Sequence, residues 1–310
     1  MPAPEGNVRR LTTLFLSLSI LLAGCAAHAS PISPHDPHVL RWGIVGLNDV
    51  PTLDPALAAD ATSLSVTSLV FGGLVRLDSH LQVQSDGASH WTISPDGTVY
   101  TFYLRPNLRF ADGTPVTAAD FAFSLERALG PQRSVGTGEF YLGLIKGSTA
   151  PSVRNGRGIA GISVVDSRTL RLKLTHPAAH FLTELAFPAS FVLEEKQLRQ
   201  LGQTWTDHAA GFGPYQVSVW RHSNYLTLER NPYYYGGRPA IARINMYFYQ
   251  DQKSALQAYR NGDLDLVSGW QAGDVSPAQL PGLRHIPGLA QDYLAFNTAQ
   301  PPLNVLKNRR

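Results

Sequence analysis

Two histidines, His176 and His180, stand four residues apart, the spacing at which two imidazoles can bind one metal ion from one helix face. Pro177 lies between them and disrupts a helix unless it occupies the first turn. No acidic third ligand follows at the spacing that zinc enzymes use. We therefore predict a structural pair, with no metal and no cofactor. A second group of histidines stands in a loose polar segment without orienting carboxylates, and we interpret it in the same way: His28, His35 and His38.

Residues suited to catalysis are few. Asp263 and Asp265 fall on one face of a short predicted strand, Asp263–Val267, and paired carboxylates at such a spacing can serve as general acid and base. Ser124 falls inside a predicted packed helix rather than on the strained turn that exposes a nucleophilic serine. The single cysteine, Cys25, directly follows a predicted export signal, residues 1–24. A secreted hydrolase is thus disfavoured, and we predict that the chain is not an enzyme.

Cys25 has a distinctive context. Residues 1–24 combine a basic start with an apolar run of about 12 residues, which is typical of a signal peptide and short for a membrane span. The Leu-Ala-Gly-Cys sequence that ends at Cys25 resembles the bacterial lipoprotein cleavage box, which implies cleavage before Cys25 and lipid on its sulfur and amine. The alternative is an ordinary secretory signal cut near Ala27 or Ala29. We predict a periplasmic or extracytoplasmic, membrane-anchored lipoprotein with a Pro-rich tether at residues 25–37.

Composition sets the broad class. The chain has 310 residues, of which 44% are hydrophobic and 16% charged, a balance typical of globular proteins. The net charge is +3 and the pI about 9.0, but Lys and Arg are scattered rather than gathered in a run. We therefore predict no nucleic-acid partner. One cysteine excludes a disulfide within the chain.

The elements that must position these residues are clearest between Trp91 and Arg127. Turn residues at 94–97 precede an alternating strand, Thr98–Arg105, and Thr117 with Asp120 begins a helix in a pattern that resembles a capping box. A further helix from Ser63 ends at two glycines, and another spans Gln252–Asn261. Other segments predict strands, which together with the helices indicate an α/β protein: Val39–Val45, Ile159–Val165, Thr169–Leu174, Tyr215–Trp220, Tyr225–Arg230 and Ile244–Tyr249.

Residues 96–129, DGTVYTFYLRPNLRFADGTPVTAADFAFSLERAL, resemble the most diagnostic block of the dipeptide- and oligopeptide-binding proteins, the family 5 solute-binding proteins of ABC importers. Further blocks carry the same resemblance: Leu53-Asp54-Pro55, Gly211–Tyr215 and Asn231–Tyr235. The resemblance implies a two-lobed α/β fold like the type II periplasmic binding proteins, with ligand held between lobes. It also implies short peptides as ligands, an ABC transporter permease as partner and a monomeric state.

The resemblance covers nearly all of residues 38–310 but only the first part of a whole family member, so we expect most of the second large lobe to be missing. It implies the following division: signal peptide 1–24, tether 25–37, a discontinuous lobe I at 38–54 and 165–290, an inserted subdomain at 55–164, and the start of lobe II at 291–310. In this scheme Asp263 and Asp265 belong to a structural edge of the sheet.

Candidate ligand-binding residues come from two sources. The resemblance implies that Asp49 and Val50 touch the ligand backbone and that Tyr141 supplies an aromatic contact; a core role for Tyr141 stays open. Ligands of open α/β sheets lie outside the carboxyl ends of strands, which adds residues that follow the last predicted strands: Ser268, Gly269, Trp270 and Tyr293. Asp54 we interpret as a capping and turn residue.

The nature of the ligand stays open at this point. Peptides are the commonest cargo of the resembled family, but nickel chelates, haem, sugars and opines are bound by other members. A third possibility is that the chain binds nothing, because one lobe alone would expose a large apolar face. The sequence favours a protein that grips a small molecule and does not convert it.

Overall fold

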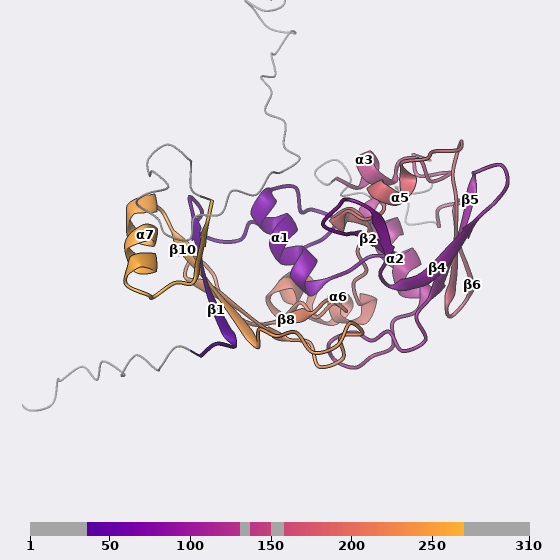
Figure 1. Ribbon diagram of the computed structural model, residues 1–310. Coiled ribbons are helices and arrows are strands. Elements are labelled where there is room, and N and C mark those ends of the chain that lie inside the picture. Colours follow the sequence, from indigo (N-terminus) through magenta and orange to yellow (C-terminus); the bar gives the residue numbers. More distant parts are fainter. Residues whose placement is uncertain (1–35, 131–136, 150–157, 270–310) are drawn as a thin grey trace, which may run out of the picture. The chain divides into compact units, whose positions relative to one another are not determined.

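The computed structural model describes residues 36–130, 137–149 and 158–269, all of which belong to the first of two compact units, Met1–Trp270 (Figure 1). Within these residues the chain forms a mixed five-stranded sheet, an antiparallel four-stranded sheet and a two-stranded hairpin. Helices pack on both larger sheets. The predicted α/β character is therefore confirmed.

The five-stranded sheet has the order β11-β1-β10-β9-β8. Its strands come from both ends of the described chain: β1 (Val39–Val45), β8 (Tyr215–Arg221), β9 (Tyr225–Arg230), β10 (Arg243–Tyr249) and β11 (Leu266–Ser268). β1 runs parallel to β10 and β11, whereas β8, β9 and β10 pair as antiparallel neighbours. The carboxyl ends of β1, β10 and β11 consequently meet at one edge of the sheet.

Helices cover this sheet on either side (Figure 1). α7 (Gln252–Arg260) connects β10 to β11 and packs on β1, β10 and β11; it begins at Asp251, whose carboxylate accepts the Ser254 N–H at 2.8 Å. α1 (Ala61–Val70) begins at Asp60 and packs against β8. α6 (Glu195–Leu201) and the short helix η3 (Gly202–His208) follow one another below α1. Apolar residues of α1, η3 and the strands form one core, which includes Ile44, Val66, Val70, Trp205, Leu226, Leu228 and Met246.

The four-stranded sheet has the order β4-β5-β7-β6, with β4 (Ala88–Ile93), β5 (Val99–Leu104), β6 (Ile162–Asp166) and β7 (Thr169–Lys173). Side chains of β5 alternate between buried and half-buried, as its sequence pattern predicts. A small hairpin of β2 (Val75–Leu77) and β3 (Val83–Ser85) precedes it. β6 crosses the predicted subdomain boundary at residue 164, and β7 pairs with β5 beyond it. The sheet therefore extends at least to Lys173.

α2 (Ala118–Ala128) supports this second sheet. Its start follows the prediction, since Asp120 accepts hydrogen bonds from the Thr117 N–H at 2.8 Å and from the Thr117 hydroxyl at 2.7 Å. One face of α2 is buried with three short helices, α3 (Gly138–Leu142), α5 (Phe181–Glu184) and η2 (Pro188–Ser190). The resulting core contains many fully buried residues, among them Phe102, Phe110, Phe121, Leu125, Leu142, Leu170, Phe181 and Phe212.

An ion pair links α2 to the segment that follows β1. Arg127 on α2 donates to both carboxylate oxygens of Asp54, one of them at 2.8 Å, and the two side chains are only 16% and 7% exposed. Asp54 also accepts the Ala56 N–H at 3.0 Å, so the predicted turn role is confirmed and the pairing is an addition to it. The guanidinium lies 5.9 Å from the ring centre of Trp205. The contact ties the Leu53–Pro55 segment to α2 and so to the core of the four-stranded sheet, which we call the second core.

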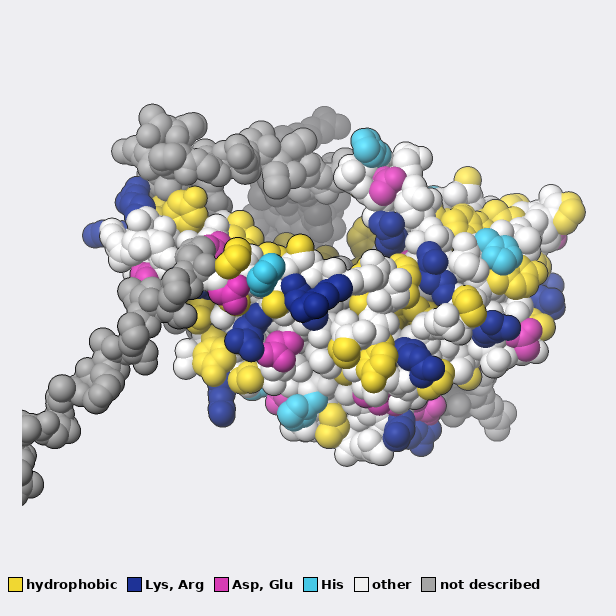
Figure 2. All heavy atoms as spheres, turned by 60° about the horizontal axis from the view of Figure 1, so that its bottom comes forward, with side chains coloured by type: hydrophobic (Ala, Val, Ile, Leu, Met, Phe, Trp, Pro, Cys, Tyr) yellow, Lys and Arg dark blue, Asp and Glu magenta, His cyan; other side chains and the backbone are white. Residues whose placement is uncertain are grey.

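The described surface has a mixed character. On the face shown in Figure 2, Lys and Arg side chains are interspersed with Asp and Glu side chains rather than gathered in one patch. Among the helices within the described ranges, none is long and apolar enough to span a lipid bilayer.

Candidate functional site

The carboxyl edge of the five-stranded sheet is the candidate site. Register places Val45 of β1 opposite Tyr249 of β10, and Ile44 opposite Ser268 of β11. Just beyond β1, the Gly46 N–H donates to the Tyr249 carbonyl at 2.8 Å. The carboxyl ends of three strands therefore lie side by side, at the kind of edge where ligands of open α/β sheets bind. The edge therefore brings together two groups of predicted ligand-binding residues that are far apart in the sequence: Asp49 and Val50 after β1, and Ser268 and Gly269 at the end of β11.

Ser268 and Gly269 occupy this edge as predicted. The Ser268 hydroxyl oxygen accepts the Trp42 indole N–H at 2.7 Å, which fixes the end of β11 to β1. Gly269 has φ +81°, and a Cβ built there would lie 2.6 Å from the Val45 carbonyl oxygen. A larger residue would meet both a strained backbone and a backbone atom, so the close approach of the two strand ends requires glycine.

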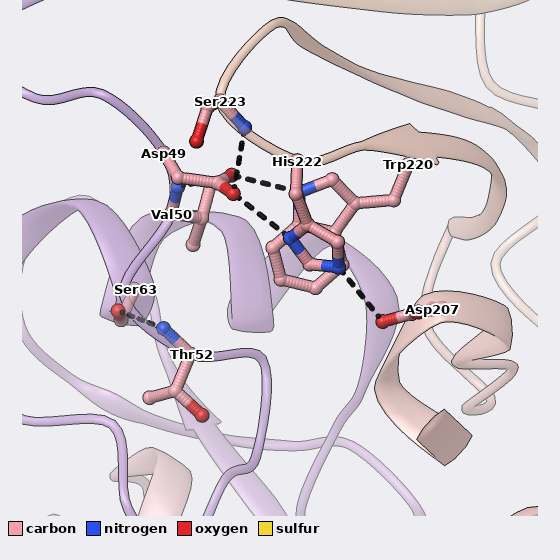
Figure 3. A network of polar contacts seen from close by, with 8 residues as sticks. All are labelled: Asp49, Val50, Thr52, Ser63, Asp207, Trp220, His222 and Ser223. Atoms are coloured by element: carbon pink, nitrogen blue, oxygen red, sulfur yellow. Dashed lines mark hydrogen bonds and ion pairs between the residues drawn. The ribbon is translucent and has the colours of Figure 1, made fainter. Parts of the chain in front are cut away.

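Asp49 lies in the loop after β1, and both oxygens of its carboxylate are engaged by other groups of the protein (Figure 3). Its Oδ1 accepts the Val50 N–H at 2.8 Å and the Trp220 indole N–H at 2.7 Å. Its Oδ2 accepts the Ser223 N–H at 3.0 Å and faces Nδ1 of His222 at 2.8 Å. The carboxylate therefore joins the loop after β1 to the turn between β8 and β9. Its acceptor capacity is spent on holding that loop.

The neighbours of Asp49 divide into buried and accessible groups. Val50 as a whole residue is only 3% exposed and packs in the core of the five-stranded sheet. Asn48 is exposed, and its side-chain oxygen, Oδ1, accepts a hydrogen bond from the Gln250 side-chain amide at 2.5 Å. This contact links the loops after β1 and β10. Val50 is thus buried and its N–H is already bonded to Asp49, so its predicted ligand contact stays a prediction. Asn48 and Gln250 are edge residues that the sequence interpretation missed.

Tyr141 is placed with the second core. It lies on α3, half-buried, and its ring stacks on Phe187 at 4.4 Å between centroids and 13° between planes. Burial and the nearby Glu184 carboxylate raise the pKa of Tyr141. The structure brings Asp49, Val50, Ser268 and Gly269 to one edge, while Tyr141 stands on a different cluster; its ligand contact stays a prediction. Trp270, Tyr293 and the proposed lipid attachment residue Cys25 lie outside the described residues.

His222 is the most distinctive residue that sequence reasoning missed. It follows β8 in the turn to β9, and its second ring nitrogen, Nε2, lies 3.2 Å from Asp207 Oδ1 of η3. Hydrogen bonding to Asp49, reinforced by Asp207, raises the pKa of His222, while its partial burial acts in the opposite direction. A lone histidine in a hairpin turn carries no sequence signal of such partners, which are 173 and 15 residues away.

A separate cavity of about 390 Å³ lies at the carboxyl end of α1. Asp86 lines it; burial raises the pKa of this carboxyl, against hydrogen bonds from the Tyr235 hydroxyl and the Gly73 N–H. Arg105 lies over the Tyr235 ring at 4.6 Å. The walls are mainly aromatic: Phe71, Phe187, Phe191, Phe212 and Tyr234. The buried Asp86 carboxylate is already engaged by Tyr235 and the Gly73 N–H, so we assign it a structural role.

One detail of the sequence interpretation is wrong. Asp263 and Asp265 precede β11 instead of lying within a strand, and Asp265 accepts from the Arg41 guanidinium at 3.1 Å, which removes any shared strand face. The Tyr233–Tyr235 segment lies in turns, and the ring centroids of Tyr234 and Tyr235 lie 5.1 Å apart. Packing remains their evident role, since Tyr235 contacts the second core.

The candidate metal and catalytic residues are accounted for within the described ranges. No group of three or more His, Cys, Asp or Glu side chains there could hold a metal ion. His180 Nε2 lies 3.6 Å from Glu184 on the same short helix. The Ser124 hydroxyl donates to the Asp120 carbonyl at 2.8 Å and accepts the Leu193 N–H at 3.1 Å. His180 and Ser124 are therefore each engaged by neighbouring groups of the protein. The edge itself offers hydrogen-bonding groups suited to holding a ligand.

Comparison with known proteins is consistent with this geometry. Residues 82–310 match the model of the bacterial extracellular solute-binding proteins, family 5. The chain is 30% identical over 314 residues to the probable deoxycholate-binding periplasmic protein YgiS of Escherichia coli, covering 98% of this chain and 57% of that protein. It is 29% identical to the oligopeptide-binding protein OppA of Bacillus subtilis, covering 84% of this chain and 49% of OppA. The chain thus spans about half the length of the curated relatives it matches.

Solved structures give the same answer for the fold. The Escherichia coli murein tripeptide-binding protein MppA matches with a TM-score of 0.67 at 26% identity, over 74% of this chain and 45% of MppA. MoaA of A. tumefaciens, solved with mannopinic acid, matches with a TM-score of 0.66 at 28% identity, over 75% of this chain and 45% of MoaA. The predicted periplasmic-binding-protein fold is confirmed. A family match over residues 82–310 and a sheet of this topology together establish that the chain belongs to family 5 of the bacterial extracellular solute-binding proteins.

Proposed function

We propose that this chain captures short peptides outside the cytoplasm and delivers them to the permease of an ABC importer. The observation that supports the proposal is the convergence of the carboxyl ends of β1, β10 and β11 at one sheet edge. An extended peptide presents regularly spaced backbone N–H and C=O groups, which main-chain groups at such an edge can pair without reading each side chain. Peptide-binding relatives, OppA and MppA, support this choice of ligand.

The proposed mechanism is capture without covalent chemistry. In the type of fold found here, domain closure around a ligand is a hinge motion, and affinity arises because the ligand stabilises the closed state more than the open one. We assign the ligand-facing roles to Ser268 and Gly269, with Asp49 and the buried Val50 holding the first loop in place. Tyr141, Trp270 and Tyr293 complete the proposed set. We further propose that the protein acts as a monomer.

A non-peptide ligand is the second candidate. Two proteins similar to this chain point to it: YgiS is described as a probable deoxycholate-binding protein, and MoaA was solved with mannopinic acid. The two candidates differ chemically, because a bile acid is a rigid apolar body with one carboxylate and mannopinic acid joins a sugar alcohol to an amino acid. The edge described above is rich in main-chain and polar groups, which favours the peptide over the bile acid, and the peptide-binding relatives favour it over mannopinic acid.

Titration calorimetry on the purified chain tests the proposal. We expect saturable heat with a series of di- to pentapeptides, and none with deoxycholate or mannopinic acid under the same conditions. Heat with either of those compounds and none with any peptide would replace the peptide proposal by the second candidate. Incubation with a chromogenic peptide adds a check on mechanism, since sustained product release would contradict a purely binding role.

Membrane attachment through Cys25 is part of the proposal and makes a separate prediction. A cysteine that carries a diacylglyceryl group and an amide-linked fatty acid has more than the two signals that stable anchoring needs. We therefore expect the Cys25→Ala protein, expressed in a bacterial host, to move from the membrane fraction to the soluble extracytoplasmic fraction. Mass spectrometry should show that the lipid on the wild-type amino-terminal peptide is absent from the variant.

A matched control keeps that result specific. Ala26→Ser changes the neighbouring residue without removing the thiol, and should leave both the fractionation and the lipid mass unchanged. An unmodified Cys25 in membrane-bound wild-type protein would show that attachment has another origin.

A further inference from the structure

His222 lies between two carboxylates from different parts of the chain (Figure 3). Its Nδ1 faces Asp49 Oδ2 at 2.8 Å, and its Nε2 faces Asp207 Oδ1 at 3.2 Å. An ionised carboxylate can only accept hydrogen bonds, so both contacts exist together only when both ring nitrogens carry a proton. The geometry is therefore that of a charged imidazolium, and a neutral ring would have to give up one of the two contacts.

The arrangement joins three elements at the candidate site. Asp49 comes from the loop after β1, Asp207 from η3, and His222 from the turn between β8 and β9. Trp220 strengthens the same junction: its indole N–H donates to Asp49, and its ring lies 4.4 Å from the His222 ring. The Ser223 N–H reaches the same Asp49 oxygen as His222. The position of the loop after β1 thus depends on contacts supplied by this turn.

Charge on the imidazole has a defined pH dependence. Within the described residues, Asp49 and Asp207 are the charged groups that face the ring, and both raise the pKa of His222. Its ordinary pKa is about 6.5. Because the folded-state pKa is raised, the two ion pairs are fully present below the ordinary value and are lost as the pH rises through the raised one. Burial against Trp220 opposes the shift without reversing it.

We propose that His222 is a positioning residue: as an imidazolium it holds the loop after β1 through Asp49, and it loosens that loop when the pH rises. The effect on ligand affinity rests on the function proposed above, whereas the effect on the loop does not. His222 is 55% exposed, so the contact is solvent-screened and its influence modest. We expect peptide affinity to fall roughly twofold to fivefold between pH 6 and pH 9, because exposed ion pairs contribute on that scale and a less ordered loop lowers apparent affinity.

Nuclear magnetic resonance on the full chain tests the loop directly. The Val50 and Ser223 amides both donate to Asp49, so their shifts should titrate together with the His222 ring in the wild-type protein. His222→Gln keeps a hydrogen-bond donor but cannot titrate, and should abolish that movement. Asp207→Asn should lower the His222 pKa toward its ordinary value while leaving the contact with Asp49. His176→Gln, an exposed histidine elsewhere, should change neither result.

Calorimetry with one tripeptide across the same pH range supplies the second readout. The His222→Gln protein should lose the affinity change between pH 6 and pH 9, while the His176→Gln protein keeps it. The proposal would be overturned if the chemical shifts of the Val50 and Ser223 amides did not change while His222 titrates. It would also be overturned if the wild type and His222→Gln showed the same dependence of peptide affinity on pH. If no peptide binds at any pH, the proposed function fails, and the positioning role is then decided by the amide titration alone.

Discussion

Replacing Arg127 by alanine should lower the free energy of unfolding by about 3–5 kcal/mol, because the change leaves the Asp54 carboxylate buried without its partner. Asp54 is 7% exposed in the ion pair, so water cannot readily take over the role of the guanidinium. The loss of Arg127 also removes its contact with the Trp205 ring. Chemical denaturation followed by circular dichroism measures the effect. Among single arginine-to-alanine changes in the described residues, this one should give one of the largest losses of unfolding free energy.

Arg199→Ala is the matched control for that measurement. Arg199 pairs with Glu195 at i,i+4 on α6, but its side chain is 75% exposed. Such a pair contributes at most about 1 kcal/mol, since solvent screens it and holding two long side chains together costs entropy. Equal destabilisation by Arg127→Ala and Arg199→Ala would show that the Asp54–Arg127 contact does not tie the segment after β1 to α2.

Phe121→Ala should destabilise the protein by about 3–5 kcal/mol, because it empties a fully enclosed site in the core of the second sheet. Phe121 has no exposed surface and lies 6.2 Å from the Phe212 ring, between centroids. Its ring tip also occupies the space next to Gly87, where a Cβ would come within 2.8 Å of it. The free energy of unfolding from denaturant titration is again the measured quantity.

Phe140→Ala provides the comparison for the core substitution. The Phe140→Ala substitution removes the same side-chain volume as Phe121→Ala, but Phe140 lies on α3 and is 78% exposed. A surface change of this kind should stay within about 0.5 kcal/mol of the wild type. If both phenylalanine variants unfolded at the wild-type denaturant concentration, the packing attributed to α2 and the four-stranded sheet would be incorrect.

Local sequence signals account for most of the fold. The strand at Val39–Val45 is found with the predicted bounds, because a compact apolar run ends there at a glycine with positive φ, Gly46. The Thr117–Asp120 capping interaction begins α2 where its pattern predicts, and the buried face of α2 follows the predicted 3.6-residue spacing. These features are encoded within a few residues, so a single sequence reveals them.

Contacts between distant segments could not be found this way. Asp54 was correctly interpreted as a turn residue, yet its ion pair with Arg127 joins positions 73 apart, and no local pattern encodes such a pairing. The His222 contacts were missed for the same reason. The strand predicted at Asp263–Val267 begins three residues late, at Leu266, because Asp265 turns to Arg41 instead of extending the strand. Alternation alone cannot distinguish a strand from a turn whose side chain has a tertiary partner.

The candidate site was predictable in outline. Asp49, Val50, Ser268 and Gly269 were chosen from resemblance and from the rule about strand carboxyl ends, and β1 and β11 do lie side by side. Which atoms remain available to a ligand was not predictable. The Asp49 carboxylate is occupied and the Val50 side chain is buried, and both facts depend on packing between segments.

Hydrogen exchange with and without peptide tests the central claim, that this protein binds extended peptides at the carboxyl edge of its five-stranded sheet. At saturating tripeptide, we expect slower amide exchange in the loop after β1, residues 46–50, and at the end of β11, residues 267–269. Amides of the β6–β7 turn should be unaffected. Slower exchange confined to other parts of the chain, with residues 46–50 and 267–269 unchanged, would contradict the account.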